Sequence, residues 1–573
     1  MFLFDLFRSF LPLRNPIGFG ASDFVEFILA ALLVLFAIVW NPLTRSYVER
    51  FAKKPVYCML LLAALPVALR LLLLPNHPVP APDVYDEFSH LLVADTLLHF
   101  RLANPPHPLH QFFETFFVLQ QPTYSSIYPI GQGLILAIGR LVSGFAWTGV
   151  LLSVAAFCAS CYWMLRGWTT PKWALLGGLL AVIEFGPLNL WMNSYWGGAL
   201  AATAGCLVFG ALPRLIERAQ GRDAALLGIG FGIHLLTRQF ESVLLFLCVV
   251  LFLVIVPRAP HELLKLRKPA VIAIVAVAPA VVITLLQNKA VTHSWTTLPE
   301  ELSQYQYGVP TTLTIQSIPI PHNQLTPEQQ LDYQAQSLTH GTDTPGRYFA
   351  RLAYRIRYYR FFFLAALYPA LIAFLFALRE RRFIWVVCAL AIFALGTNLF
   401  PYLLVHYLAG VTSLFILIGV VGLQQLSQFT IGGAFVGSEA ARVIVFLCAA
   451  HFFFWYGLHL FETEQISTEM MRYETWDSIN HRNPERRIEV RRIDVDRQLA
   501  AIPGKQLVFV RYWPQHVFQD EWVWNAADID AARVVFARDL GAGENEKLCH
   551  YYSDRKVWLL EPDFRPPRLT GYH

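Results

Sequence analysis

From about Val25 to Leu460 the chain is a succession of long apolar runs separated by short polar connections. A helix needs about 20 residues to cross the roughly 30 Å hydrocarbon core of a bilayer, so each run of about that length is a candidate span. Twelve runs qualify, at residues 26–40, 56–74, 146–165, 173–191, 197–213, 223–238, 241–256, 269–287, 358–378, 383–400, 407–424 and 442–460. The pattern therefore predicts an all-α polytopic membrane bundle of about twelve spans.

The segment after Leu460 has a different pattern. It alternates strand-like runs at 506–512, 532–537 and 557–561 with a helix-compatible stretch at 544–551, which is typical of a small α/β domain. We expect two domains, a membrane domain at 1–462 and a soluble domain at 463–573. Two long loops, 75–145 and 288–355, interrupt the membrane domain, and the second has a helical period only around 327–337.

Composition agrees with this division, since 55% of the residues are hydrophobic and 15% are charged, against about 25% charged in an average soluble protein. The formal net charge of +5 says little, because in membrane proteins the placement of Lys and Arg sets the orientation. Basic residues gather in short connections that we expect on the cytoplasmic side: Arg45, Arg50, Lys53, Lys54, Arg166, Lys172, Arg214, Arg218, Arg222, Arg258, Lys265, Arg267, Lys268, Arg379, Arg381 and Arg382.

The long loops are expected on the other face. Residues 75–125 contain a single basic residue, Arg101, among several acids. The apolar stretch Tyr128–Gly144 looks like a further span, but counting it as one would move Arg166 and Lys172 to the wrong side. We therefore predict a juxtamembrane helix in the interface. Both loops and the terminal domain then lie outside.

The first loop carries the leading candidates for chemistry, Asp86 and Glu87, at the start of an amphipathic stretch that runs from Tyr85 to Phe100. Acids in a first helical turn are stabilised by the helix dipole, which is a purely structural explanation. The pair also follows closely on a span, where a carboxylate can act as a base or a metal ligand. His90, one turn after Asp86, would join a divalent metal site or serve as an interfacial polar residue.

Three more candidates are expected near the same face. Glu184 lies in an otherwise apolar run and would face a cavity, an ion-pair partner or the protein core. Tyr195 belongs to a short polar and aromatic turn. Arg238 ends a short span, where its planar guanidinium would suit a phosphate, or would anchor the helix and pair with Glu241.

Arginines and a His-Tyr pair complete the set. Arg347, Arg351, Arg355, Arg357 and Arg360 recur about once a turn before and into the 358–378 run. They would form a basic helical face for a phosphate or an anionic headgroup, or a plain surface anchor. The pair His406-Tyr407 lies near the start of a late span, where a buried structural histidine is the alternative.

The order of these features resembles a known family. A span followed by Asp86-Glu87, an amphipathic helix, Pro105-Pro106 and a second interfacial helix is similar to the start of the GT-C glycosyltransferases. The resemblance is to the branch that uses dolichyl- or undecaprenyl-phosphate sugars, such as protein O-mannosyltransferases and the lipid A aminoarabinose transferase. It implies that Asp86 is the catalytic base with Glu87 as its companion, that Arg238, Arg357, His406 and Tyr407 meet the lipid phosphate, and that His90, Glu184 and Tyr195 line the site.

The function implied is an inverting glycosyltransferase that moves a sugar from a polyprenyl-phosphate donor to a lipid, glycan or protein acceptor. We expect it in a bacterial inner membrane, among membrane lipids, with its site facing the periplasm or exterior, and with no nucleic acid as partner. A divalent metal at Asp86, Glu87 or His90 is compatible but not required. The alternatives are a membrane transporter or lipid flippase, with Glu184 and Arg238 on its pathway, and a non-catalytic scaffold. No phosphate-binding Gly-rich loop, zinc pattern or nucleophile elbow is present.

Overall fold

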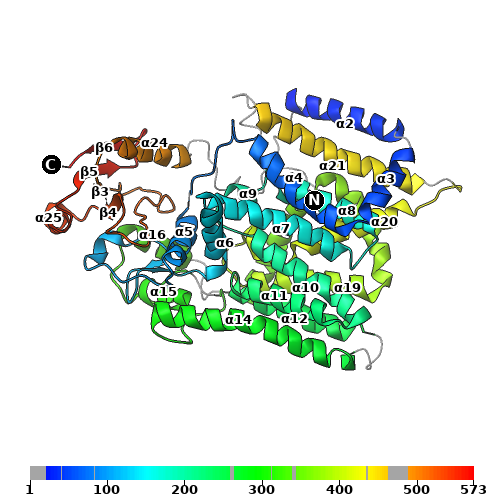
Figure 1. Ribbon diagram of the computed structural model, residues 1–573, viewed down its shortest axis with the longest axis horizontal. Coiled ribbons are helices and arrows are strands. Elements are labelled where there is room, and N and C mark those ends of the chain that lie inside the picture. Colours follow the sequence, from blue (N-terminus) through cyan, green and yellow to red (C-terminus); the bar gives the residue numbers. More distant parts are fainter. Residues whose placement is uncertain are drawn as a thin grey trace.

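The computed structural model describes residues 21–39, 42–82, 84–257, 263–310, 313–337, 343–433, 436–461 and 488–572. A bundle of helices forms most of the molecule, and a small sheet domain lies at one end of it (Figure 1). The expected boundary between residues 462 and 463 falls outside the described residues.

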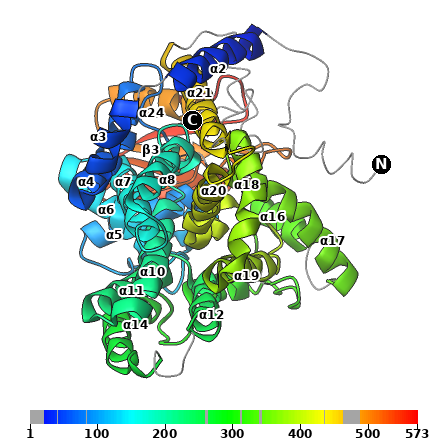
Figure 2. The same ribbon diagram turned by 90° about the vertical axis from the view of Figure 1, so that its right-hand side faces the viewer.

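A row of helices forms one side of the bundle, and each member packs against the next. Figure 2, which looks along the bundle from the end away from the sheet, shows α14, α11 and α10 stacked in this order. The members of the row are α14 (Arg267–Thr292), α11 (Gly221–Leu235), α10 (Ala199–Arg218), α7 (Trp147–Leu165) and α4 (Pro55–Leu72).

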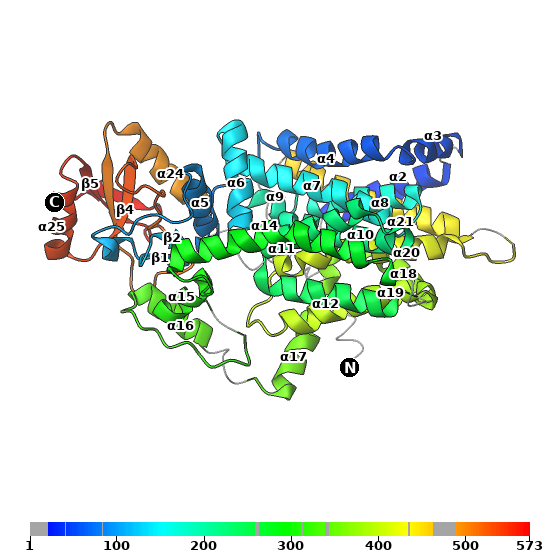
Figure 3. The ribbon, with the colours of Figure 1, turned by 60° about the horizontal axis from the view of Figure 1, so that its bottom comes forward.

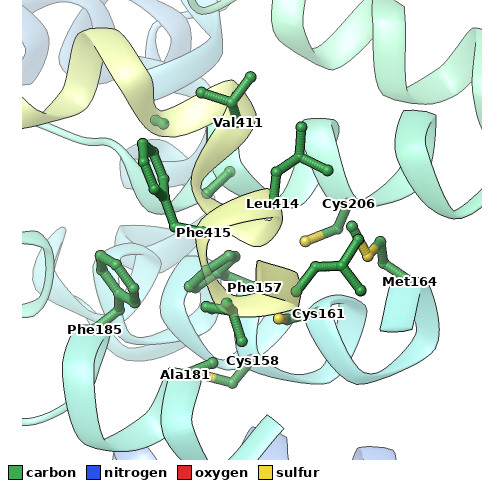
Figure 4. Packing of buried hydrophobic residues seen from close by; sticks show 14 of the residues in the cluster. Phe157, Cys158, Cys161, Met164, Ala181, Phe185, Cys206, Val411, Leu414 and Phe415 are labelled. Carbon is green, nitrogen blue, oxygen red and sulfur yellow. The ribbon is translucent and has the colours of Figure 1, made fainter. Parts of the chain in front are cut away.

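The centre of the bundle is η5 (Val405–Val411) followed by α20 (Thr412–Ser427), whose residues from Thr412 to Leu423 are all buried. Phe157 and Cys161 of α7, Phe185 of α8 and Cys206 of α10 converge on Phe415 and its neighbours (Figure 4). The remaining helices surround this core: α2 (Ala21–Val39), α3 (Pro42–Ala52), α8 (Pro171–Phe185), α12 (Gln239–Ile255), α18 (Tyr368–Phe374), α19 (Arg381–Thr397) and α21 (Val436–Phe461).

Among the residues that the structure describes, six helical segments are long and apolar enough to cross a membrane: Pro55–Leu72, Trp147–Leu165, Ala199–Arg218, Arg267–Thr292, Val405–Ser427 and Val436–Gly457. Shorter apolar helices are found at Phe27–Val39, Ile130–Ser143, Gln239–Ile255 and Ala365–Arg379. Apolar side chains on the outside of α2, α4 and α14 remain exposed, as expected for surfaces that face lipid. The predicted polytopic membrane bundle is confirmed.

Two expected spans are interrupted. The run at 358–378 consists of η2 (Arg357–Phe362), η3 (Ala365–Leu367), α18 and η4 (Leu375–Arg379). The interruption lies at Phe363 and Leu364, which are not helical, whereas residues Ala365–Arg379 form one continuous helix through Pro369. A proline is tolerated there because it lies in the first turn of α18. The run at 173–191 likewise ends at Phe185, and the short α9 (Leu190–Asn193) follows it.

Two helices lie across the end of the bundle instead of along it (Figures 1 and 3). They are α5 (Tyr85–Leu98) and α6 (Ile130–Ser143), at the positions where the sequence predicts an amphipathic and a juxtamembrane helix. The amphipathic character predicted for α5 is wrong, because residues Glu87 to Ala94 are all buried, between α6 and the C-terminal domain. The rest of the first loop forms η1 (His110–Phe113) and the paired strands β1 (Val118–Leu119) and β2 (Ser125–Ser126).

The second loop is more regular than its sequence indicates. It forms α15 (Pro299–Tyr307), α16 (Pro327–Ser337) and α17 (Pro345–Ile356). The predicted helix at 327–337 is confirmed, whereas α15 was not expected. Glu301 caps α15 by accepting a hydrogen bond from Leu298 N (2.9 Å), a local signal typical of helix starts.

The C-terminal domain contains a four-stranded sheet in the order β4-β3-β5-β6. The central strand β3 (Gln506–Val510) is parallel to β4 (Val534–Arg538) and β5 (Lys556–Glu561), and β6 (Arg568–Gly571) is antiparallel to β5. The helices α24 (Ile488–Ala501) and α25 (Ala542–Tyr551) complete the domain. The predicted α/β domain, with its three strands and one helix, is confirmed.

Several basic connections meet at the end of the bundle opposite to the sheet domain (Figure 1). Lys172 pairs with Glu49 at 3.6 Å, and Arg382 donates to the Trp168 carbonyl at 3.3 Å. These contacts connect the basic segments around Lys172 and Arg382 with their neighbours at this end of the molecule, whereas α5, α15 and α16 of the two long loops lie near the other end (Figure 3).

Candidate active site

The site is built around Asp86, the second residue of α5. Its carboxylate accepts a short hydrogen bond from the Tyr128 hydroxyl and a second one from the Trp196 side chain. Burial raises the pKa of Asp86 to about 6, and the two hydrogen bonds and the positive charge of Arg238 limit this rise. Asp86 is therefore a carboxylate that is more basic than usual and still ionised at neutral pH.

The turn between α11 and α12 brings Arg238 to Asp86. Gly131, in the first turn of α6, donates its N–H to the Leu236 carbonyl at 2.7 Å. A Cβ atom at Gly131 would lie 2.5 Å from the same oxygen, so only glycine permits this approach. Since Tyr128 immediately precedes α6 and Arg238 follows Leu236 by two residues, this contact sets the position of Tyr128 relative to Arg238.

Arg238 is the cation of the site. Its guanidinium carbon lies 5.3 Å from the centre of the Tyr407 ring, an attractive cation–π geometry. One guanidinium nitrogen is 4.0 Å from a carboxylate oxygen of Glu241. Glu300 of α15 is also within electrostatic range of Arg238, and burial raises the pKa of Glu300 to about 7.

The aromatic wall of the site comes from η5 and the turn after α9. The ring of His406 lies 5.2 Å from that of Trp196 and 4.9 Å from that of Tyr407, measured between ring centres. His406 is buried, whereas Tyr407 keeps part of its surface accessible. Of this pair, Tyr407 therefore faces Arg238 and His406 supports the tryptophan that binds Asp86.

Glu87, although adjacent to Asp86, has different partners. One carboxylate oxygen accepts the backbone N–H of Tyr195 at 2.7 Å, and the other accepts that of Val84 at 3.2 Å. Tyr195 in turn donates its hydroxyl to the Pro80 carbonyl at 2.9 Å. Both residues thus tie α5 to the turn that carries Trp196 and form the frame of the site.

His90 stacks on the ring of Tyr128, with 4.3 Å between ring centres. Burial, together with the charge of Arg238, lowers the pKa of His90 to about 3, so its ring is neutral. Its Nδ1 atom is buried without a hydrogen-bond partner among the residues that the structure describes. His90 therefore holds Tyr128 against Asp86 through ring contact.

The predicted metal ligands do not form a metal site in this arrangement. Asp86 accepts hydrogen bonds from side chains, Glu87 binds two backbone N–H groups, and His90 lies flat on Tyr128. Within the described ranges no group of three or more His, Cys, Asp or Glu residues has the geometry to hold an ion.

Two predicted residues lie apart from this cluster. Glu184 is on the side of α8 that faces α21, within electrostatic range of Cys448. Arg357 is half-buried in η2, and in the described part of the chain it makes no hydrogen bond or ion pair with Asp86, Arg238 or Tyr407. Its neighbour Arg355 comes nearer to Tyr407, but it donates to the backbone carbonyls of Thr397 and Pro401 at 3.2 and 2.7 Å.

The sequence did not point to Tyr128, Glu300 or Asp332. Asp332 of α16 is 2% exposed, and Gln336 donates to both of its carboxylate oxygens at 2.8 and 2.9 Å. Burial, with a smaller contribution from the charge of Asp86, raises the pKa of Asp332 to about 7. The helical spacing of Asp332 and Gln336 was the one local signal for this pair.

The C-terminal domain holds α5 in place from the other side. Trp524 donates its indole N–H to the Phe88 carbonyl at 2.9 Å, and Arg492 lies over the Phe88 ring at 4.5 Å. Further along α5, Asp95 binds Arg140 of α6 at 2.9 Å and the Ala527 N–H at 2.7 Å. The helix that carries Asp86 is thus fixed by α6 and by the last domain of the chain.

Comparison with known proteins gives matches among solved structures. ArnT from Cupriavidus metallidurans bound to undecaprenyl phosphate superposes with a TM-score of 0.51 at 12% identity, over 87% of this chain and 92% of that one. The oligosaccharyltransferase of Archaeoglobus fulgidus in complex with Zn and sulfate gives a TM-score of 0.46 at 13% identity, over 88% and 67%. No protein-family model and no curated protein sequence matches the chain.

At this level of identity the likeness concerns the fold. The ArnT superposition extends over nearly the whole of both chains, and the interfacial helices and the terminal domain were expected from the sequence. The chain therefore shares the fold of ArnT.

Proposed function

We propose that the protein is an inverting glycosyltransferase, which moves a sugar from a polyprenyl-phosphate donor to an acceptor hydroxyl on the non-cytoplasmic face. The observation that carries the proposal is the juxtaposition of Asp86 and Arg238 at one end of a membrane bundle. Asp86 has a raised pKa of about 6 and lies within electrostatic range of the arginine. Glycosyl transfer from a phosphate needs a base that removes the proton of the acceptor hydroxyl and a cation that stabilises the negative charge of the departing phosphate. Asp86 and Arg238 are placed to supply the two.

In the proposed step Asp86 removes the proton of the acceptor hydroxyl. The hydroxyl oxygen attacks the anomeric carbon from the side opposite to the phosphate, so the configuration inverts. The bond between the anomeric carbon and the phosphate oxygen breaks, and the lipid phosphate leaves with the electron pair. A base with a pKa near the working pH is effective because it is both ionised and a good proton acceptor.

Arg238 would stabilise the departing phosphate. A guanidinium offers a planar fork of donors that fits phosphate oxygens, and the contact of Arg238 with Glu241 is long, at 4.0 Å. That ArnT was solved with undecaprenyl phosphate bound supports a lipid phosphate as the ligand. Tyr407, stacked near the guanidinium, would keep it oriented while the phosphate binds.

The proposed orientation rests on the basic connections. They lie at the end of the bundle away from Asp86, and basic loops remain cytoplasmic. The long loops and the C-terminal domain would then face the periplasm or exterior of a bacterial inner membrane.

The substitution Asp86→Asn tests the mechanism, because asparagine keeps the shape of the side chain and cannot accept the proton. With purified protein in nanodiscs and a labelled polyprenyl-phosphate sugar, we expect transfer to fall by about 10²- to 10⁴-fold, the usual contribution of a general base. Donor binding should be retained. The exposed Asp494→Asn in α24 is the matched control and should transfer normally.

Undiminished transfer by Asp86→Asn would contradict the mechanism. Movement of the labelled lipid across the bilayer without transfer to any acceptor would instead favour a flippase.

A further inference from the structure

A cleft of about 870 Å³ lies where the first loop, the second loop and the C-terminal domain meet. Its walls include Gln120 from the first loop, Asn323 from the second, and Tyr512 from the C-terminal domain. Sites for small ligands commonly measure about 300–1,000 Å³, so the cleft is large enough for a ligand of several rings.

The cleft adjoins the proposed active site through two helices of the second loop. Glu328 of α16 lines the cleft, and Asp332, one helical turn or about 6 Å further on, is within electrostatic range of Asp86. In α15, Tyr307 lines the cleft and Glu300 is within range of Arg238. A ligand in the cleft would therefore lie behind the helices that cover the site.

The walls of the cleft are rich in side-chain amides. Each amide offers a donor and an acceptor, and a sugar hydroxyl needs both. The amides that line the cleft are those of Gln111, Gln120, Gln121, Gln306, Asn323 and Gln324.

Two of these amides have oxygen atoms with unused hydrogen-bonding capacity. Gln120 is 1% exposed, and its amide nitrogen donates to the Phe113 carbonyl at 2.6 Å. The amide nitrogen of Gln306 donates to the Gln121 carbonyl at 2.9 Å. Both amide oxygens are buried, and neither has a partner in the part of the chain that the structure describes. Unsatisfied acceptors of this kind are costly, and a ligand in the cleft would satisfy them once the amide groups turn towards it.

The arginines that line the cleft form ion pairs with carboxylates of the protein itself. Arg538 pairs with Glu328, and Arg511 pairs with Asp539. Glu114 accepts the Tyr307 hydroxyl at 2.9 Å. Since every arginine of the cleft already has a carboxylate partner, the walls disfavour a phosphate or an anionic headgroup and suit a neutral ligand with many hydroxyls.

A peptide fits the walls less well. Peptides often bind by adding a strand to an open sheet edge, but of the edge strand β4 only its last residue, Arg538, lines the cleft. Apolar anchor pockets are also few, since Leu325, Pro327, Val510 and Leu540 are the apolar residues along the cleft.

We propose that this cleft binds a neutral oligosaccharide. This oligosaccharide would belong to the acceptor molecule and would carry the hydroxyl that reacts at Asp86. The proposal rests on the proposed function where it names the ligand an acceptor, but binding itself needs no transfer. The acceptor is then a glycan or glycoconjugate, and the cleft selects it before Asp86 acts.

The test is saturation-transfer NMR on the full-length protein in nanodiscs. The probes are neutral manno-, malto-, cello- and chito-oligosaccharides of two to four units, a mixed-sequence tetrapeptide pool, and inorganic phosphate detected by ³¹P relaxation. We expect transfer to at least one oligosaccharide series. Gln324→Trp, which fills the cleft from an exposed loop position, should weaken binding at least tenfold, and Gln120→Met, which removes the buried acceptor, should do the same.

The control Gln330→Trp lies on the exposed side of α16 outside the cleft and should bind normally. The proposal is overturned if no oligosaccharide series binds, if Gln324→Trp binds as well as the unmodified protein, or if only the peptides or phosphate bind. Asp86→Asn should retain oligosaccharide binding while losing transfer, so failure of the cleft and failure of the catalytic mechanism give different results.

Discussion

Asp86 and Glu87 are neighbours in sequence and yet have separate tasks. Both carboxylate oxygens of Glu87 accept hydrogen bonds from backbone N–H groups. The carboxylate of Asp86 accepts hydrogen bonds from the side chains of Tyr128 and Trp196. The sequence pattern, two acids at the start of a helix, does not tell these two roles apart, because acids in the first turn are favoured by the helix dipole whatever groups they contact. The sequence identified the pair, and the division of roles became visible only when their partners were placed.

Replacement of Tyr128 by phenylalanine should change the pH dependence of transfer. In the proposed mechanism Asp86 acts as an ionised base, so transfer should fall as the pH drops below the Asp86 pKa of about 6. The Tyr128 hydrogen bond stabilises the ionised form, and without it the pKa rises. We expect the acidic limb of the kcat/KM profile to move to higher pH in Tyr128→Phe.

Tyr124→Phe is a matched control for this measurement, since the Tyr124 hydroxyl donates to the Asn525 carbonyl at 3.0 Å. Its acidic limb should remain where it is in the unmodified protein. A limb that stays unchanged in Tyr128→Phe as well would mean that Asp86 is not the group that titrates.

Glu87→Gln should affect stability more than the titration of the base. Glutamine keeps one acceptor oxygen but turns an NH₂ group towards a backbone N–H, which leaves a buried donor unsatisfied. We expect a loss of about 1–3 kcal/mol, measured by thermal unfolding in detergent, and an acidic limb at the same pH as before. A large loss of kcat at unchanged stability would instead indicate a direct role in the reaction.

At the scale of elements, the position of α6 decides whether Tyr128 and Arg238 meet. Gly131→Val would place side-chain atoms on the Leu236 carbonyl and Thr237, so α6 must shift. Because small displacements of catalytic groups reduce rates strongly, we expect kcat/KM to fall about tenfold or more, with donor binding weakened. Gly457→Ala in α21, where a Cβ would have no neighbour within 4 Å, should leave kcat/KM unchanged.

The elements themselves were largely predictable because burial in lipid leaves a simple signature of long apolar runs. The charge argument correctly assigned Tyr128–Gly144 to an interfacial helix. The prediction of a single helix at 358–378 was wrong, because hydropathy does not register the break at Phe363 and Leu364. The helix α15 was missed since its polar sequence resembles a loop, and only its capping pattern indicates the start.

The site was less predictable than the elements. Asp86, Arg238 and Tyr407 could be selected because charged or polar residues at the ends of apolar runs are unusual. Tyr128 and Asp332 have no such signal, since tyrosine is common at membrane interfaces and Asp332 lies in a polar helix. Their importance depends on which elements meet in space, and one sequence does not contain that information.

At the scale of the whole molecule, Cys549 tests the proposed orientation. It lies in α25 of the C-terminal domain, while the other seven cysteines lie in the helical bundle. In right-side-out membrane vesicles, a membrane-impermeant maleimide should label Cys549 without permeabilisation. Partial burial raises the pKa of its thiol, so the labelling is best performed near pH 8. Cys549→Ser should abolish the signal.

Labelling that requires permeabilisation would place the C-terminal domain in the cytoplasm and reverse the proposed topology. Since the domain packs on α5, the catalytic face would be reversed with it.

The packing of the C-terminal domain on α5 also bears on how the protein is made. Ribosomes synthesise chains from the N-terminus, so the helix that carries Asp86 is produced well before its packing partners Arg492, Trp524 and Ala527. A nascent chain can insert the membrane helices that lie between them and still lack the contacts that fix α5. Competence for transfer would therefore arise only once the segment 492–527 has been made and has folded, and chains terminated before this segment would be inert in the membrane.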